Sequence, residues 1–200
     1  MKKIISIVLA LVFVLSISAC GAAKTPKPED TVKEFCEAMK SMDWDKMGSL
    51  CVGDRFNSSS FEEFETSAPF LADYMKENIP KTEYTINAAS VDEDTATVTV
   101  NFKYINGYLI VREAAQNTMQ NILGMALTGA VNEDDLPDVF NQYMSTAIKD
   151  AQENLGNTTK ETDVQFTLSK EDGKWMISDF DDEFSTILSC NTLSALDDLS

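Results

Sequence analysis

The chain has 200 residues, no histidine and a formal net charge of −17 at pH 7. This charge argues against a nucleic-acid partner, because phosphates must be neutralised by lysine and arginine side chains. The absence of histidine removes the commonest general base and the commonest metal ligand. An apolar fraction of 44% supports one domain with a real hydrophobic core, and we expect no cofactor and no metal.

Residues 1–19 have the three parts of an export signal. Lys2 and Lys3 form a positive start, residues 4–15 are almost entirely apolar, and residues 16–19 are small and weakly polar. The apolar run has about a dozen residues, whereas a spanning helix needs roughly 20. We therefore expect a signal peptide that is cleaved, the alternative being an uncleaved membrane anchor.

The leader closes on Ile17-Ser18-Ala19-Cys20, an aliphatic residue and two small residues before a cysteine. This tetrapeptide resembles the lipobox of bacterial lipoproteins. The resemblance implies that the Cys20 sulfur carries a diacyl (palmitate-type) anchor, because two acyl chains hold a protein on a membrane stably. We expect residues 20–28 to tether a domain to the extracytoplasmic face of a bacterial cell membrane. The alternative is an ordinary secretory cleavage site followed by a free cysteine.

Loss of the leader removes two of the 16 basic side chains and none of the 33 acidic ones. The exported chain is therefore still more acidic, which argues against a domain lying flat on an anionic membrane. Such a charge suits a soluble domain or a cationic partner.

Three cysteines remain if Cys20 is acylated: Cys36, Cys51 and Cys190. Cys36 and Cys51 lie on successive predicted helices, and export permits a disulfide between them. Closing a loop of about 15 residues would stabilise the fold by ~3 kcal/mol in the chain-entropy model. The alternative is three buried free thiols, which pack as small hydrophobic groups.

Helical spacing of apolar residues predicts helices over residues 29–42 and 43–50, and again over 61–75. Pro69 should split the last of these into two pieces, and Pro80 should end it. Either Ser59 with Glu62 or Ser60 with Glu63 predicts a capping box at its start.

Strict alternation over residues 96–104 predicts a strand, paired through a turn at 92–94 with a strand at 84–88. The alternation slips near Ala88-Ala89, which indicates a bulge. A second strand pair is expected at 164–168 and 174–180. Between the pairs, two helical stripes over residues 107–157 predict a helical hairpin, and residues 181–200 are either a closing helix or partly loose. Antiparallel hairpins with separate helices indicate an α+β fold.

Four stretches carry a second resemblance: residues 28–39, 42–47, 96–100 and 172–177. Together they resemble small bacterial lipoproteins of uncharacterised function with a nuclear-transport-factor-2-like (cystatin-like) fold. The resemblance implies N-terminal helices packed on a curved antiparallel sheet that encloses a conical cavity. Residues 29–200 would form this one domain, with the helical hairpin at about 107–157 as an insertion between two strand pairs.

Five aromatic residues are candidates for a ligand pocket in such a cone: Trp44, Phe102, Tyr104, Phe166 and Trp175. The alternative is that they simply form the core, since alternating aromatic residues on strands are usually buried. Five aspartates are candidates for a general base, although helix starts and solvated loops explain them as well: Asp43, Asp45, Asp179, Asp181 and Asp182.

The sequence contains no nucleophile elbow and no phosphate-binding loop. We therefore expect a non-catalytic binding module for a small molecule, a peptide or an envelope protein. One alternative is a small-molecule isomerase or hydrolase that uses an aspartate at the cone, and another is a surface spacer. An open cone beside a buried carboxylate would favour the enzyme, whereas a filled cone and an exposed apolar patch on the hairpin would favour protein binding.

Overall fold

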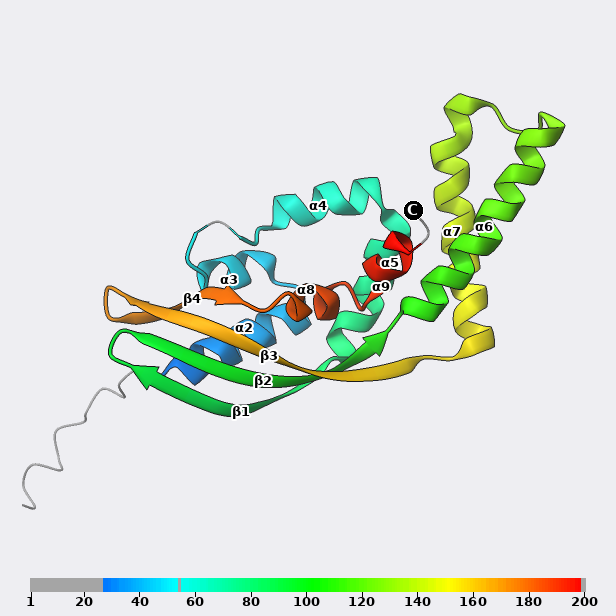
Figure 1. Ribbon diagram of the computed structural model, residues 1–200. Coiled ribbons are helices and arrows are strands. Elements are labelled where there is room, and N and C mark those ends of the chain that lie inside the picture. The colour runs from blue at the N-terminus through cyan, green and yellow to red at the C-terminus, as the bar shows by residue number, and fades with distance from the viewer. Residues whose placement is uncertain (1–26, 54, 199–200) are drawn as a thin grey trace, which may run out of the picture.

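The computed structural model describes residues 27–53 and 55–198 (Figure 1). The predicted leader, Cys20 and most of the tether lie outside these residues. The fold is α+β, as predicted, with one curved antiparallel sheet in the strand order β1-β2-β3-β4. The strands are β1 (Glu83–Asp92), β2 (Thr95–Asn106), β3 (Thr158–Glu171) and β4 (Lys174–Phe180).

Two N-terminal helices open the domain, α2 (Pro28–Ser41) and α3 (Trp44–Ser49). Met42 adopts a left-handed conformation with φ 57° and so ends α2. The Asp43 side chain then caps α3 by accepting a hydrogen bond from the Lys46 backbone N–H at 2.9 Å. The apolar stripe of α2 faces the sheet and is buried.

The next helical segment is divided at Pro69, as predicted, into α4 (Ser58–Ser67) and α5 (Pro69–Asn78). A short 3-10 turn, η2 (Ile79–Lys81), follows. The predicted capping boxes are wrong, because Asn57 is the N-cap and its side chain accepts from the Ser60 N–H at 2.8 Å. The helix thus begins before either predicted serine, and both lie within its first turn.

The sheet is continuous across both predicted strand pairs. β1 pairs with β2, and the register shifts between Ile86 and Ala88, which confirms the predicted bulge to within two residues. β2 pairs with β3 along its whole length, from Thr95 opposite Ser169 to Asn106 opposite Thr158. Every second residue of β2 from Ala96 to Tyr104 is buried against the helices. Figure 1 shows α3, α4 and α8 on one side of the sheet.

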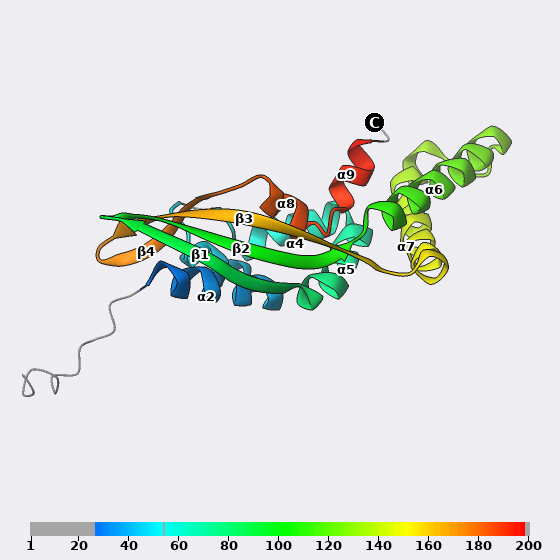
Figure 2. The same cartoon turned by 60° about the horizontal axis from the view of Figure 1, so that its bottom comes forward.

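The predicted helical hairpin joins β2 to β3 and consists of α6 (Tyr108–Thr128), η3 (Glu133–Asp135) and α7 (Leu136–Leu155). The buried residues of α6 all lie in its first half, between Ile110 and Thr118. Its second half and the connection to α7 extend beyond the end of the sheet (Figures 1 and 2). The insertion therefore has a base packed in the core and a projecting tip.

The chain closes with two short helices, α8 (Glu183–Leu188) and α9 (Thr192–Asp197). Between them Cys190 and Asn191 both adopt positive φ, 52° and 57°. The Cys190 carbonyl accepts a hydrogen bond from the Gly107 N–H at 2.8 Å, and the Asn191 amide donates to Asn106 Oδ1 at 2.9 Å. The C-terminal segment is thus attached to the base of the hairpin.

Phe184 of α8 lies at the centre of the core. Its ring centroid lies 5.4 Å from that of Phe35, 5.5 Å from that of Phe166 and 6.1 Å from that of Phe102. These residues come from α2, α8 and two strands, and all four have at most 1% of their surface exposed. The space enclosed by the curved sheet is therefore filled by aromatic side chains.

We predict that Phe184→Ala lowers the free energy of unfolding by about 3–5 kcal/mol, because it removes a buried ring and leaves a cavity. Urea denaturation followed by circular dichroism measures the loss. Phe64→Ala is the matched control, since Phe64 is only half-buried and should cost much less. Equal losses for the two variants would contradict a core organised around Phe184.

Candidate functional site

The structure does not bring the five predicted pocket residues together around one cavity. Phe102 and Phe166 have no exposed surface and Tyr104 has 1%, so a water-sized molecule does not reach them. These three side chains are core, which is the alternative that the sequence left open. Trp175 is buried beneath the Lys170 ammonium, 5.5 Å from the ring centroid, and Trp44 borders a groove on another part of the surface.

The candidate Cys36–Cys51 disulfide is not formed in the structure, where Cys36, Cys51 and Cys190 are free and buried. Cys36 belongs to the core-facing stripe of α2, whereas Cys51 lies at the edge of β4 in a bridge with Ile177. Burial raises the pKa of the Cys51 thiol to about 11 and that of Cys190 to about 12. Thiols with such values stay protonated at neutral pH and are poor nucleophiles.

The candidate aspartates have structural partners. Asp45 accepts hydrogen bonds from the Ser58 hydroxyl and N–H at 2.6 and 2.9 Å, and these lower the pKa of its carboxyl. Asp181 accepts from the Gln165 N–H at 2.9 Å.

The remaining aspartates also act in the local structure. Asp43 caps α3, and Asp179 pairs with Arg55 at 3.3 Å. The Asp182 carbonyl accepts a hydrogen bond from the Ser185 N–H at the start of α8. These contacts fix loops and helix ends, and none of them places a carboxylate in the filled cone.

Within residues 27–53 and 55–198, no group of three or more metal-ligating side chains is arranged to hold an ion. In the same part of the chain, no helix has the length and apolarity needed to cross a bilayer.

An apolar groove of about 270 Å³ opens between α4 and the segment that carries α8 and α9. We call it the α4 groove. Its apolar walls are formed by Trp44, Phe56, Phe61, Phe64, Met75, Leu188 and Leu193. Helix α4 buries none of its residues completely, so Phe61 and Phe64 are only partly covered. The groove thus combines several partly exposed aromatic rings in one concavity, the usual character of a ligand site.

Helix α4 is held in place from its N-terminus. Asn57 caps it, and Asp45 of α3 binds Ser58 through two hydrogen bonds. The rings of Trp44 and Phe61 then stack with centroids 4.7 Å apart and an interplanar angle of 23°. Helix α4, which forms one wall of the groove, is therefore fixed relative to α3 although none of its residues is fully buried.

Among the described residues that line the α4 groove, Arg55 is the one that carries a charge. Its guanidinium donates to the Ser178 carbonyl at 2.8 Å and lies 5.2 Å from the centre of the Phe180 ring. A second cation, Lys76, lies 5.9 Å from the ring centroid of Phe61 and pairs with Glu65. Although the chain is strongly acidic, two cationic side chains, those of Arg55 and Lys76, lie next to the rings of Phe180 and Phe61.

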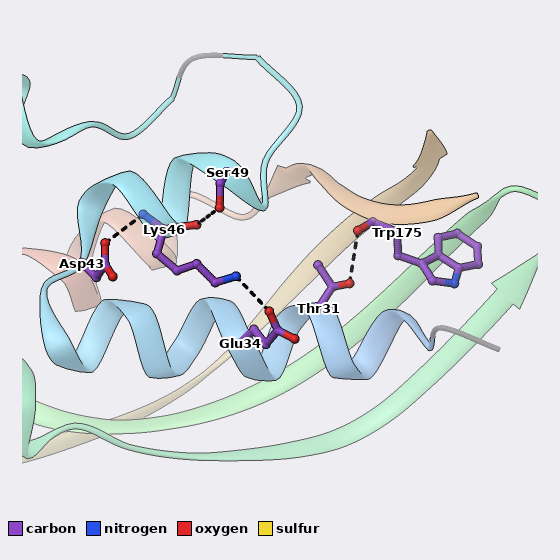
Figure 3. A network of polar contacts seen from close by, with 6 residues as sticks. All are labelled: Thr31, Glu34, Asp43, Lys46, Ser49 and Trp175. Carbon is purple, nitrogen blue, oxygen red and sulfur yellow. Dashed lines mark hydrogen bonds and ion pairs between the residues drawn. The ribbon is translucent and has the colours of Figure 1, made fainter. Parts of the chain in front are cut away.

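A second concavity follows α2 and α3 and differs in character (Figure 3). It is an open trough lined by both signs of charge, and Lys46 pairs with Glu34 at 3.1 Å. Figure 3 also shows the Thr31 hydroxyl donating to the Trp175 carbonyl, which ties α2 to β4. These contacts serve the packing of α2 on its neighbours. Seven of the eight described residues that line the trough are polar or charged, so it differs from the α4 groove in the chemistry of its side chains.

No protein-family model matches the chain, and no curated protein sequence matches it either. The function is therefore argued from the geometry of the α4 groove and from the sequence.

Sequence reasoning missed most residues of the groove. Phe61 and Phe64 belong to the helical spacing that predicts a helix over residues 61–75, and this spacing does not identify a site. Arg55 and Phe56 lie in the irregular segment between two helices, where no periodicity identifies a site. One available signal was that Arg55 is one of only two arginines and is followed directly by an aromatic residue.

We predict that Tyr104→Phe raises the free energy of unfolding by about 1 kcal/mol, because the buried Tyr104 hydroxyl has no hydrogen-bond partner within residues 27–53 and 55–198. Urea denaturation measures the change. Tyr108→Phe is the control, since the Tyr108 hydroxyl donates to the exposed Asp198 and its removal should change stability little. Destabilisation by Tyr104→Phe would mean that the hydroxyl binds a buried water or ligand in the cone.

Proposed function

We propose that the protein is a lipid-anchored, extracytoplasmic binding module without catalytic activity, and that the α4 groove binds a small apolar molecule carrying a carboxylate. The anchor rests on the lipobox-like Ile17-Ser18-Ala19-Cys20. The binding function rests on one observation: a concave group of partly exposed aromatic rings with a guanidinium in its lining.

The size and walls of the α4 groove favour a narrow apolar ligand. Its volume of about 270 Å³ is at the low end of ligand sites, which commonly enclose roughly 300–1,000 Å³. Phe61, Phe64 and Leu188 offer apolar contact without hydrogen-bonding groups that would need a polar partner. A hydrocarbon chain fits such walls better than a sugar or a nucleotide.

Arg55 favours an anionic end on that ligand. A guanidinium binds a carboxylate through two parallel hydrogen bonds. Its present partner, Asp179, has a side chain that is 71% exposed, and an exposed ion pair contributes little stability. A ligand carboxylate can therefore replace Asp179 at small cost while the Ser178 contact is kept.

We predict that dodecanoate binds more tightly than dodecanol, below the concentration at which either aggregates. The protein for this test carries Cys20→Ala, so that no acyl chain of its own competes, and Trp175→Phe, so that Trp44 is its one tryptophan. Trp44 fluorescence reports occupancy of the groove. Arg55→Gln should weaken dodecanoate binding roughly tenfold and leave dodecanol binding unchanged, because it removes charge-assisted hydrogen bonds only.

Two further variants separate the apolar contacts from net charge. Phe64→Ala should weaken the binding of both ligands. Lys160→Gln makes the same charge change as Arg55→Gln at an exposed site on β3, and it should alter neither affinity. No fluorescence response to either ligand, or equal effects of Arg55→Gln and Lys160→Gln, would refute the proposed ligand class.

We predict that Cys20→Ala releases the protein from the membrane fraction and that the wild-type protein carries an acyl mass that this variant lacks. Cell fractionation and intact-protein mass spectrometry measure the two effects. Cys190→Ala serves as the matched cysteine control and should stay membrane-bound. A Cys20→Ala protein that remains in the membrane with unchanged mass would exclude lipidation at this residue.

A further inference from the structure

One face of α6 is apolar, exposed and without a partner in the structure. Met119, Leu123 and Leu127 have 55%, 60% and 80% of their surface exposed. Residues four apart lie on the same side of a helix, so these three form one stripe. The opposite side of α6 faces α7, as the contact between the Tyr143 hydroxyl and the Met125 sulfur at 3.8 Å shows. We call the exposed stripe the outer face of α6.

The outer face is also uncharged. Residues 114–132 contain no acidic or basic side chain, which is the longest such run among the described residues of this acidic chain. Gly124 is next to Leu123. A Cβ atom added to Gly124 would have no atom of a described residue within 4 Å, apart from its chain neighbours and the backbone of α6. Glycine in a helix interior is destabilising, and no described residue outside α6 fills the space beside Gly124. An uncharged face with a glycine suits the close approach of another helix.

Charges lie at the two ends of this face, and they have opposite signs. At the base, Arg112 is exposed and stands two turns before Met119 on the same side of α6. It stacks near the Tyr108 ring and has no ion-pair partner among the described residues. At the tip, Asp134 and Asp135 are exposed in η3.

We propose that the outer face of α6 binds the same face of a second copy of the chain, antiparallel, across a two-fold axis at Leu123. Met119 of each copy then meets Leu127 of the other. The same arrangement places Arg112, near the start of each α6, opposite Asp134 and Asp135 of the other copy. A parallel arrangement would bring the acidic tips together, where they would repel.

A second copy fits this surface because the pairing is self-complementary, as an isologous interface requires. A net charge of −17 makes two copies repel each other over most of their surfaces. The outer face is where apolar contact is available and acidic side chains are missing. The inference does not depend on the α4 groove, since none of these α6 residues lines it.

Cysteine crosslinking of the full chain in intact cells tests the geometry. Leu123→Cys places two thiols together at the two-fold axis, so mild oxidation should give a covalent dimer in high yield. Leu109→Cys is the matched control, because Leu109 is 51% exposed on the same helix but lies far from the axis. A Leu123→Cys protein that stays monomeric, or that crosslinks to a different protein, would overturn the proposal.

Charge exchange tests the antiparallel arrangement in sedimentation equilibrium of the Cys20→Ala protein. Arg112→Glu should raise the dimer dissociation constant at least about tenfold, and adding Asp134→Arg and Asp135→Arg should restore it. Leu123→Glu should abolish the dimer while circular dichroism stays unchanged, since Leu123 is 60% exposed. A protein that is monomeric before any substitution, or an Arg112→Glu defect that the reverse charges do not restore, would contradict the interface.

Discussion

The packing of Phe184 among the aromatic rings of α2 and the sheet is the contact on which the architecture depends. Its ring lies 4.9 Å from that of Phe180 and 5.5 Å from that of Phe166, so α8 is held against the inner side of the sheet. A curved sheet leaves a space that must be filled by side chains, by water or by a ligand. Here the chain fills it with Phe184 of α8, and the surrounding rings of Phe35, Phe102 and Phe166 have no exposed surface.

The arrangement of α4 follows from this filled interior. With Phe184 occupying the cone, Phe61 and Phe64 of α4 pack against the outside of the core and stay partly buried. A groove remains because α4 is fixed by the Asp45–Ser58 contacts and the Trp44–Phe61 stack, while none of its residues is fully buried. Its rings are therefore only partly covered. The same side chains that would be core in a larger domain stay partly exposed in this one.

Local periodicity was sufficient to predict most elements of the fold. The alternation in β2, the break at Pro69 and the slip near Ala88 are each determined by neighbours in the sequence, and the structure agrees with all three. The cap of α4 was mispredicted, because Asn57 and two serines are equally good caps and the backbone between Arg55 and Ser58 decides among them.

Contacts between distant segments could not be predicted in this way. Phe184 lies in an acidic segment without clear periodicity, and its burial depends on rings that come from residues 35, 102 and 166. Arg55 approaches the α4 groove because its guanidinium binds Ser178, more than a hundred positions later in the chain. The candidate site depends on such contacts more than the fold does, so the fold was predicted and the site was not.

The net charge of the chain bears on both proposed binding surfaces, the α4 groove and the outer face of α6. A net charge of −17 favours solubility and makes copies of the chain repel each other, and Leu127 is nevertheless 80% exposed. Exposed apolar residues that gather on one face need an explanation, whereas scattered ones do not. The α4 groove and the outer face of α6 are two such clusters of exposed apolar residues, and they are formed by different residues of one domain. None of the residues of the outer face lines the α4 groove, so the two proposals rest on separate sets of residues and can be tested independently.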